Sequence, residues 1–152
     1  MERDNKARRI CAGLFLVYGL IMVYLLFLQR TPPSISLKLH IELSTNLIPF
    51  KTIFQQLHLL EGGAFVRFAF INLVGNVVMF IPMGLLPGIW EKQRKFGRYV
   101  LTVALVIALI EALQLLTRLG SADIDDWLLN MLGSVIGFEI WRTAGKIFRL
   151  YQ

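Results

Sequence analysis

Long apolar runs recur along the chain and are separated by polar segments. They cover about residues 10–28, 65–90, 99–116 and 124–141. A run of roughly 20 apolar residues is long enough for an α-helix to cross the hydrocarbon core of a bilayer. The first run carries no charge and lacks the cleavage site of a secretory signal, so we expect it to be retained. The pattern predicts one all-α integral membrane domain over 1–152, a four-transmembrane-helix bundle.

Basic residues flank these runs unevenly. The chain is 56% hydrophobic with a mean hydropathy of +0.62, too apolar for an ordinary soluble domain. Most of its 16 Lys and Arg residues precede the first run, join the second to the third or follow the fourth: Arg3, Lys6, Arg8, Arg9, Lys92, Arg94, Lys95, Arg98, Arg142, Lys146 and Arg149. The positive-inside rule therefore predicts a multi-pass cell-membrane protein with cytoplasmic N and C termini. The pI of 9.8 reflects this topology, and no nucleic acid is expected as a partner.

The segment 29–64 is a long connection that this topology places outside the cell. Residues 35–43 alternate apolar and polar with period two, which predicts a half-buried strand or an extended segment on the membrane surface. A turn-like break follows at Asn46–Phe50. From Lys51, apolar residues recur at helical spacing, at Ile53, Phe54, Leu57 and Leu60. We expect a short amphipathic helix in the outer interface, the alternative being a loop that merely covers the bundle.

Polar and small residues interrupt the last three runs at helical spacing. A carboxylate inside a spanning helix costs about 2.5 to 3.5 kcal/mol on insertion scales, so such groups usually face a protein interior and have a function. The alternating direction of the spans brings the polar stripes to the outer leaflet, which predicts a polar cavity open to the outside. The candidate ligand-binding residues are Asn72, Asn76, Glu111, Gln114, Arg118, Asp125, Asp126 and Asn130.

Several of these residues also have structural explanations. Asp123 fits an N-cap with Asp126 as its capping-box acid. The amides and Asp126 could serve as interhelical hydrogen-bond glue. Glu111 needs a cation or a proton, and Arg118 on the same helix is its natural partner. Gly133 and Gly137 form a G-x-x-x-G step that permits close helix packing.

Metal and cofactor chemistry find little support in the sequence. His40 and His58 lack metal-site spacing, and the acidic run at 123–126 lacks the glycine-containing frame of a calcium loop. There is no phosphate-binding glycine loop, dinucleotide fingerprint or hydrolase motif. We therefore expect no metal and no cofactor. The candidate catalytic pair, if a reaction is catalysed, is Glu111 and Asp126, two carboxylates able to share acid and base duties.

The order and spacing of these motifs resemble the VanZ-like family over about residues 10–141. The matching motifs are Asn46-Leu-Ile-Pro49-Phe50, Asn72-Leu-Val-Gly-Asn76-Val-Val-Met-Phe-Ile-Pro82-Met-Gly84, Glu111-Ala-Leu-Gln114, and Asp123-Ile-Asp-Asp126 with Asn130, Gly133 and Gly137. The resemblance implies a small bacterial membrane protein of the cell envelope, in a family with a member associated with teicoplanin resistance. The structural candidates are Asn46, Pro49, Pro82, Gly84, Asp123, Gly133 and Gly137. The chain departs from the family where an arginine often precedes the aspartates, since Gly120 and Ser121 stand there.

These observations favour an envelope protein that binds a ligand in an outward-facing polar site within the membrane. The expected partners are the lipid bilayer and a lipid-linked cell-wall precursor or a lipoglycopeptide, with a contribution to glycopeptide tolerance. The alternative is an intramembrane hydrolase or transferase that acts on a lipid-linked substrate. A purely structural role is the third explanation. The oligomeric state stays open, with a homodimer through Gly133 and Gly137 as one arrangement.

Overall fold

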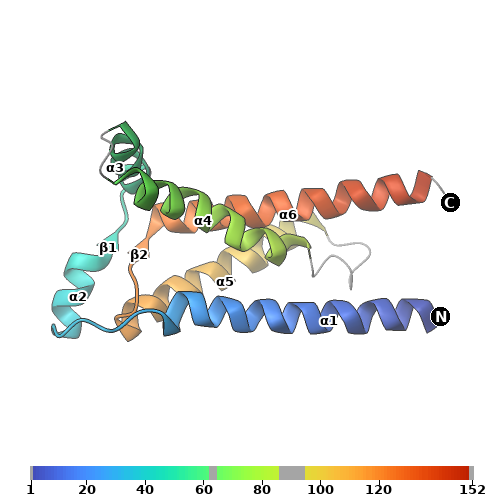
Figure 1. Ribbon diagram of the computed structural model, residues 1–152, viewed down its shortest axis with the longest axis horizontal. Coiled ribbons are helices and arrows are strands. Elements are labelled where there is room, and N and C mark those ends of the chain that lie inside the picture. Colours follow the sequence, from blue (N-terminus) through green and yellow to red (C-terminus); the bar gives the residue numbers. More distant parts are fainter. Residues whose placement is uncertain (1, 62–64, 86–94, 151–152) are drawn as a thin grey trace.

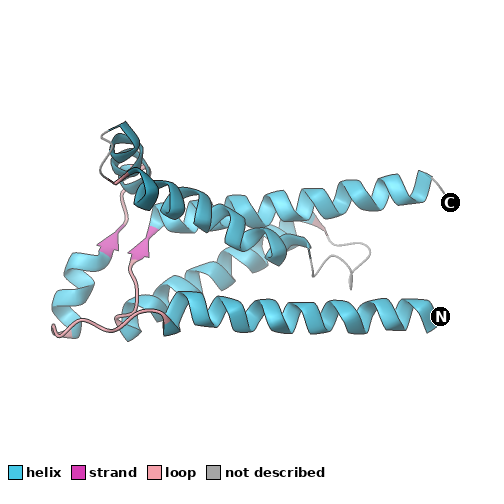
Figure 2. Cartoon of the chain, viewed as in Figure 1, coloured by secondary structure: helices cyan, strands magenta, loops and turns pink. Residues whose placement is uncertain are grey.

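A computed structural model describes residues 2–61, 65–85 and 95–150 of the chain. It is almost entirely helical (Figure 2). The elements are α1 (Glu2–Val23), the π-helical turn η1 (Tyr24–Leu28), α2 (Leu37–Ser44), β1 (Thr45–Asn46), α3 (Lys51–Glu61), α4 (Val66–Leu85), α5 (Phe96–Thr117), β2 (Ala122–Asp123) and α6 (Ile124–Leu150). The long helices run along the long axis of the molecule. Both chain ends lie at one end of this axis, and α2, α3 and the two strands lie at the other (Figure 1).

Within the described residues, three helices are long and apolar enough to cross a membrane. They are Arg9–Leu28, Val66–Leu85 and Phe96–Thr117. Their outward side chains are large and apolar, with exposed fractions of 65% at Leu16 and 63% at Leu105. Such surfaces suit contact with lipid. The chain is therefore a helical membrane protein.

The predicted fourth span corresponds to part of α6, which is not among these three helices. Acidic and amide side chains such as Asp125, Asp126 and Asn130 lower its apolar character. The end of the predicted second span, residues 86–90, and the basic residues Lys92 and Arg94 lie outside the described residues.

The strand expected over residues 35–43 is wrong. This segment forms α2, which begins after Ser36, whose Oγ accepts a hydrogen bond from the Leu39 N–H at 3.3 Å. A serine N-cap satisfies a helix donor that an extended chain would leave free. The helix also buries His40, whose Nε2 lies 2.9 Å from the Gly120 carbonyl oxygen. Capping and burial together outweigh a period-two pattern that is short enough to fit either structure.

The long helix α6 packs against α4 through glycines. A side chain at Gly133 would collide with the Val77 carbonyl, and one at Gly137 with the Ile81 carbonyl. On α4, a side chain at Gly84 would meet the backbone of Ser134. The G-x-x-x-G face is thus occupied by α4 of the same chain. It is not free to form the homodimer considered from the sequence.

Aromatic side chains fix α5 against an adjoining face of α6. Tyr99 is fully buried, stacks on Phe138 with ring centroids 4.5 Å apart and donates its hydroxyl to the Ser134 carbonyl at 2.8 Å. Trp127 donates its indole N–H to the Ala104 carbonyl at 3.1 Å. Helices α4 and α5 together therefore cover the polar stripe of α6.

Candidate functional site

The connection that leads into α6 is anchored by Asp123. Strand β2 pairs in parallel with β1, which sets Asp123 beside Asn46. The Asp123 carboxylate accepts from Asn46 Nδ2 at 3.0 Å, from the Thr52 hydroxyl at 2.6 Å and from the Asp125 N–H at 2.9 Å. The last of these bonds has the geometry of the expected N-cap. Asp126 does not complete a capping box, because its carboxylate accepts from Asn76 instead.

Asp125 is fully buried and holds the start of α3. Its carboxylate accepts the backbone N–H groups of Phe50, Thr52 and Ile53, the last two at 2.7 and 3.2 Å. Phe50 adopts a left-handed conformation with φ 66°, which turns these donors toward one acceptor. The four exposed amide hydrogens at a helix start need such a partner. Asp125 therefore faces α3 rather than the polar cavity formed by its neighbours.

The polar cavity lies where η1, α4, α5 and α6 meet. Its volume is about 70 Å³, and its lining is mostly polar: Leu25, Leu26, Arg30, Asn72, Asn76, Met79, Glu111, Gln114, Ser121, Asp126 and Asn130. Six of the eight residues predicted to bind a ligand line this cavity. Arg118 and Asp125 are the two that do not.

Pairs of polar side chains cross the cavity between helices. Asn76 on α4 donates to the Asp126 carboxylate at 2.7 Å, and Asn130 on α6 donates to Glu111 on α5 at 3.4 Å. These are the bonds that interhelical glue would make. The buried Oδ1 atom of Asn130 is an acceptor that has no hydrogen-bond partner within the described part of the chain. A buried oxygen without a partner is costly unless a water or a ligand satisfies it.

The cation beside the carboxylates is Arg30, and the expected pairing of Glu111 with Arg118 is wrong. Arg118 ends α5 in a left-handed conformation with φ 60°, and its guanidinium donates to the Ile35 carbonyl at 2.8 Å. Arg30 lines the same cavity as Glu111 and Asp126, and its guanidinium donates to the Leu119 carbonyl at 3.3 Å. Sequence reasoning missed Arg30. The available signal was its position just past the first apolar run, at the level where the carboxylates were expected.

The π-helical turn η1 closes the cavity on the side of α1. Its register is fixed by the bond from the Gln29 N–H to the Tyr24 carbonyl at 3.1 Å. The Leu26 carbonyl, in the last turn before the helix ends, accepts from Gln114 Nε2 at 3.2 Å. Gln114 thus ties α5 to η1. Turns of this kind are rare and occur frequently at functional sites.

No group of three or more metal-ligating side chains occurs among the residues whose placement the structure describes. His40 lies away from the cavity carboxylates, because its two ring nitrogens face the Gly120 carbonyl and the Ser44 hydroxyl.

Apolar helices long enough to span a bilayer, wrapped around a small polar cavity, define a helical membrane protein with a buried polar centre. Residues 15–149 match the family model described as VanZ/LLP1, and the chain belongs to this family. It is 25% identical over 134 residues to Protein VanZ of Enterococcus faecium, covering 88% of this chain and 74% of that protein. No solved structure matches the chain.

Proposed function

We propose that the polar cavity binds the head group of an amphiphile at the outer leaflet of the bacterial cell membrane, and that this binding contributes to glycopeptide tolerance. One observation carries the proposal. Six polar residues from α4, α5 and α6 converge on one cavity, and a buried oxygen of Asn130 is left for a further donor. Polar groups inside a membrane protein are costly, and they commonly mark a binding site or a pathway.

We propose further that α6 is a fourth span and that both termini are cytoplasmic. The polar stripe of α6 is covered by α4 and α5, so lipid would meet its apolar sides. In Figure 1, α1 begins and α6 ends at the same end of the long axis, and basic residues cluster in the sequence at both of these helix ends. By the positive-inside rule, the end with α2, α3 and the polar cavity then faces outward.

The size of the cavity limits what can enter it. A volume of about 70 Å³ is roughly that of two water molecules in the liquid. It can hold the terminal donor of a head group and not a whole head group or glycopeptide. A lipid, a lipid-linked cell-wall precursor and a lipoglycopeptide all present such groups at the membrane surface.

Arg30 gives this chain a guanidinium at the cavity even though Gly120 and Ser121 precede the aspartates. A side chain at Gly120 would press against Gln114 and the Arg30 guanidinium. The small residue therefore leaves space in which Arg30 reaches the cavity from the segment after η1. We propose that Arg30 takes the place of the arginine that often precedes the aspartates in related sequences.

The link to teicoplanin tolerance rests on family membership and on the similarity to Protein VanZ. The test is to express the protein in a susceptible strain and to measure the minimal inhibitory concentration of teicoplanin. Replacing Glu111 with Gln and Asp126 with Asn keeps shape and removes both carboxylates, and it should remove the tolerance. Glu139→Gln is the matched control, because Glu139 pairs with Arg142 on exposed α6 surface. Unchanged tolerance of the double variant at equal membrane abundance would disprove the proposal.

The alternative function is an intramembrane hydrolase or transferase that acts on a lipid-linked substrate. The observation in its favour is that both Glu111 and Asp126 line the same small cavity. An acid and a base in one site can divide proton transfers between them. Purified protein incubated with a membrane lipid extract would then generate a new species by mass spectrometry. Binding alone leaves the lipid masses unchanged.

A further inference from the structure

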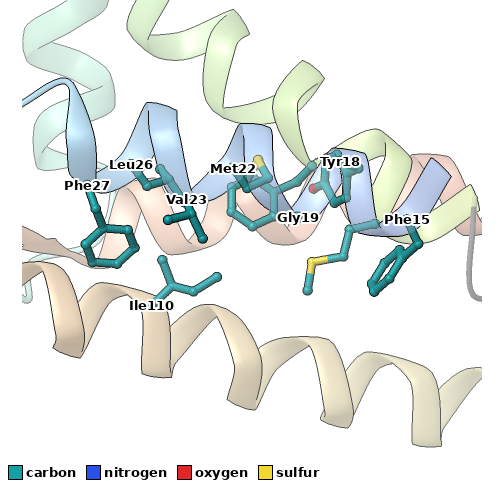
Figure 3. A pocket seen from close by; sticks show the side chains of 10 residues that line it. Phe15, Tyr18, Gly19, Met22, Val23, Leu26, Phe27 and Ile110 are labelled. Carbon is teal, nitrogen blue, oxygen red and sulfur yellow. The ribbon is translucent and has the colours of Figure 1, made fainter. Parts of the chain in front are cut away.

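A second cavity, which is apolar, adjoins the polar one. It lies between α1 and α5 and is bounded by Phe80 and Met83 of α4 (Figure 3). Its volume is about 220 Å³. Among the described lining residues only Tyr18 carries a hydroxyl, and it donates this group to the Met79 carbonyl at 3.0 Å, so none of their side chains has a polar group left for a ligand. We call this cavity the apolar crevice.

The apolar crevice and the polar cavity meet at Leu26, which lines both. Leu26 belongs to the π-helical turn, and its carbonyl is held by Gln114 on α5. This hydrogen bond ties η1 to α5 at the junction. An apolar crevice that opens beside a polar cavity has the two-part chemistry of one amphiphile.

We propose that the apolar crevice holds a segment of one acyl chain of a membrane phospholipid, whose ammonium head group donates hydrogen bonds into the polar cavity. This inference rests on the function proposed above and specifies its ligand. The cavity offers acceptors on Glu111, Asp126 and the unpartnered Oδ1 atom of Asn130, against one cation, Arg30, among its described lining residues. That balance favours a compact head group rich in donors.

The dimensions fit a chain segment. An apolar cavity of about 150 Å³ holds a benzene molecule, so 220 Å³ corresponds to roughly nine carbons in single file. The crevice adds little affinity, because the surrounding lipid tails are as apolar as its lining. Its effect is on position. The head group supplies the binding, and the crevice determines where the chain of the bound lipid lies.

Gly19 provides a way to fill the crevice. It lines the crevice on α1, and a Cβ added there would meet no atom within 4 Å. Gly13 on the same helix has equally open space but does not line the crevice. Gly19→Leu should therefore occupy the crevice, and Gly13→Leu is its matched control. Val23→Phe, a second filling variant from the same helix, covers the case in which Gly19→Leu does not fold.

The experiment places the full chain in vesicles of phosphatidylethanolamine and phosphatidylglycerol. A small fraction of the phosphatidylethanolamine carries a photoactivatable diazirine in the middle of one acyl chain. We expect crosslinks at crevice residues such as Phe27 and Ile110. These should fall several-fold in Gly19→Leu and in Val23→Phe, and stay unchanged in Gly13→Leu. The same labelled chain on phosphatidylglycerol should crosslink there several-fold less.

Three results would overturn the inference. One is crosslinking at Leu105 and Leu115, which line another apolar groove between α5 and α6, in place of the crevice. The second is a pattern of crosslinks that stays the same when Gly19→Leu or Val23→Phe fills the crevice. The third is equal crosslinking by labelled phosphatidylethanolamine and labelled phosphatidylglycerol. The proposed function is tested separately, by retention of phosphatidylethanolamine in native mass spectrometry. If Glu111→Gln with Asp126→Asn does not reduce retention, the polar site itself fails. If the double variant retains less lipid but Gly19→Leu leaves the crosslinks unchanged, only the acyl-chain inference fails.

Discussion

Substitution with Asn should affect a different property at each of two adjacent aspartates on α6. Asp125 accepts three backbone N–H groups at the start of α3, whereas Asp126 accepts one side-chain amide and lines the polar cavity. Replacing either residue with Asn keeps its size and removes its charge. We expect Asp125→Asn to lower stability and Asp126→Asn to lower ligand binding.

The expected magnitudes follow from the hydrogen bonds. A bond to a charged acceptor contributes about 1.5 to 3 kcal/mol. An amide at position 125 keeps one acceptor oxygen but turns an NH₂ group toward the other backbone donors, so at least one bond is lost. Asp125→Asn should therefore lower the free energy of unfolding by about 2 to 4 kcal/mol. At position 126 the amide oxygen can still accept from Asn76, and interhelical bonds in membranes average about 0.6 kcal/mol, so stability should change by less than about 1 kcal/mol.

The assay is reversible unfolding of the purified full chain in mixed detergent micelles, together with retention of phosphatidylethanolamine by native mass spectrometry. Asp125→Asn should unfold at a lower denaturant concentration and retain lipid while folded. Asp126→Asn should unfold like the unaltered protein and retain several-fold less lipid. Equal effects of the two variants on both measurements would refute the division of roles between the neighbours.

Two further pairs of variants test the packing and the cation. Gly137→Val should lower the free energy of unfolding by about 3 kcal/mol or more, since the new side chain would meet the α4 backbone. Gly13→Val should change it little. If the two variants unfold alike, the packing of α4 against α6 is contradicted. Arg30→Gln should change lipid retention several-fold, because Arg30 lines the cavity, and Arg118→Gln should leave retention unchanged, because Arg118 binds the Ile35 carbonyl. A larger change of lipid retention in Arg118→Gln than in Arg30→Gln would contradict the assignment of Arg30 as the cation of the cavity.

Helical periodicity carried most of the information about the polar cavity. Glu111 and Gln114 share one face of α5, and Asp126 and Asn130 share one face of α6, so spacing alone was enough to group them. The antiparallel order of the helices then brought both faces to Asn72 and Asn76 on α4. The G-x-x-x-G step predicted close packing, and α4 is the element that uses it.

Contacts between segments distant in the sequence were beyond the reach of periodicity. Asp125 and Asp126 are adjacent and chemically identical, yet the left-handed Phe50 brings α3 to one of them only. Arg30 lines the cavity from the segment that follows the π-helical turn η1, and no pattern in the sequence indicated that turn. The segment 35–43 was too short for its alternation to distinguish a strand from α2, and burial of His40 against Gly120 decided it.

The central claim is that the polar cavity holds a head group, and a structure of the protein purified from bacterial membranes in mild detergent tests it most directly. The account predicts elongated density with one end within hydrogen-bond distance of Glu111, Asp126 or the Asn130 Oδ1 atom. The rest of the density should pass Leu26 into the apolar crevice. Density for isolated waters alone, or side chains that close the cavity, would contradict the account.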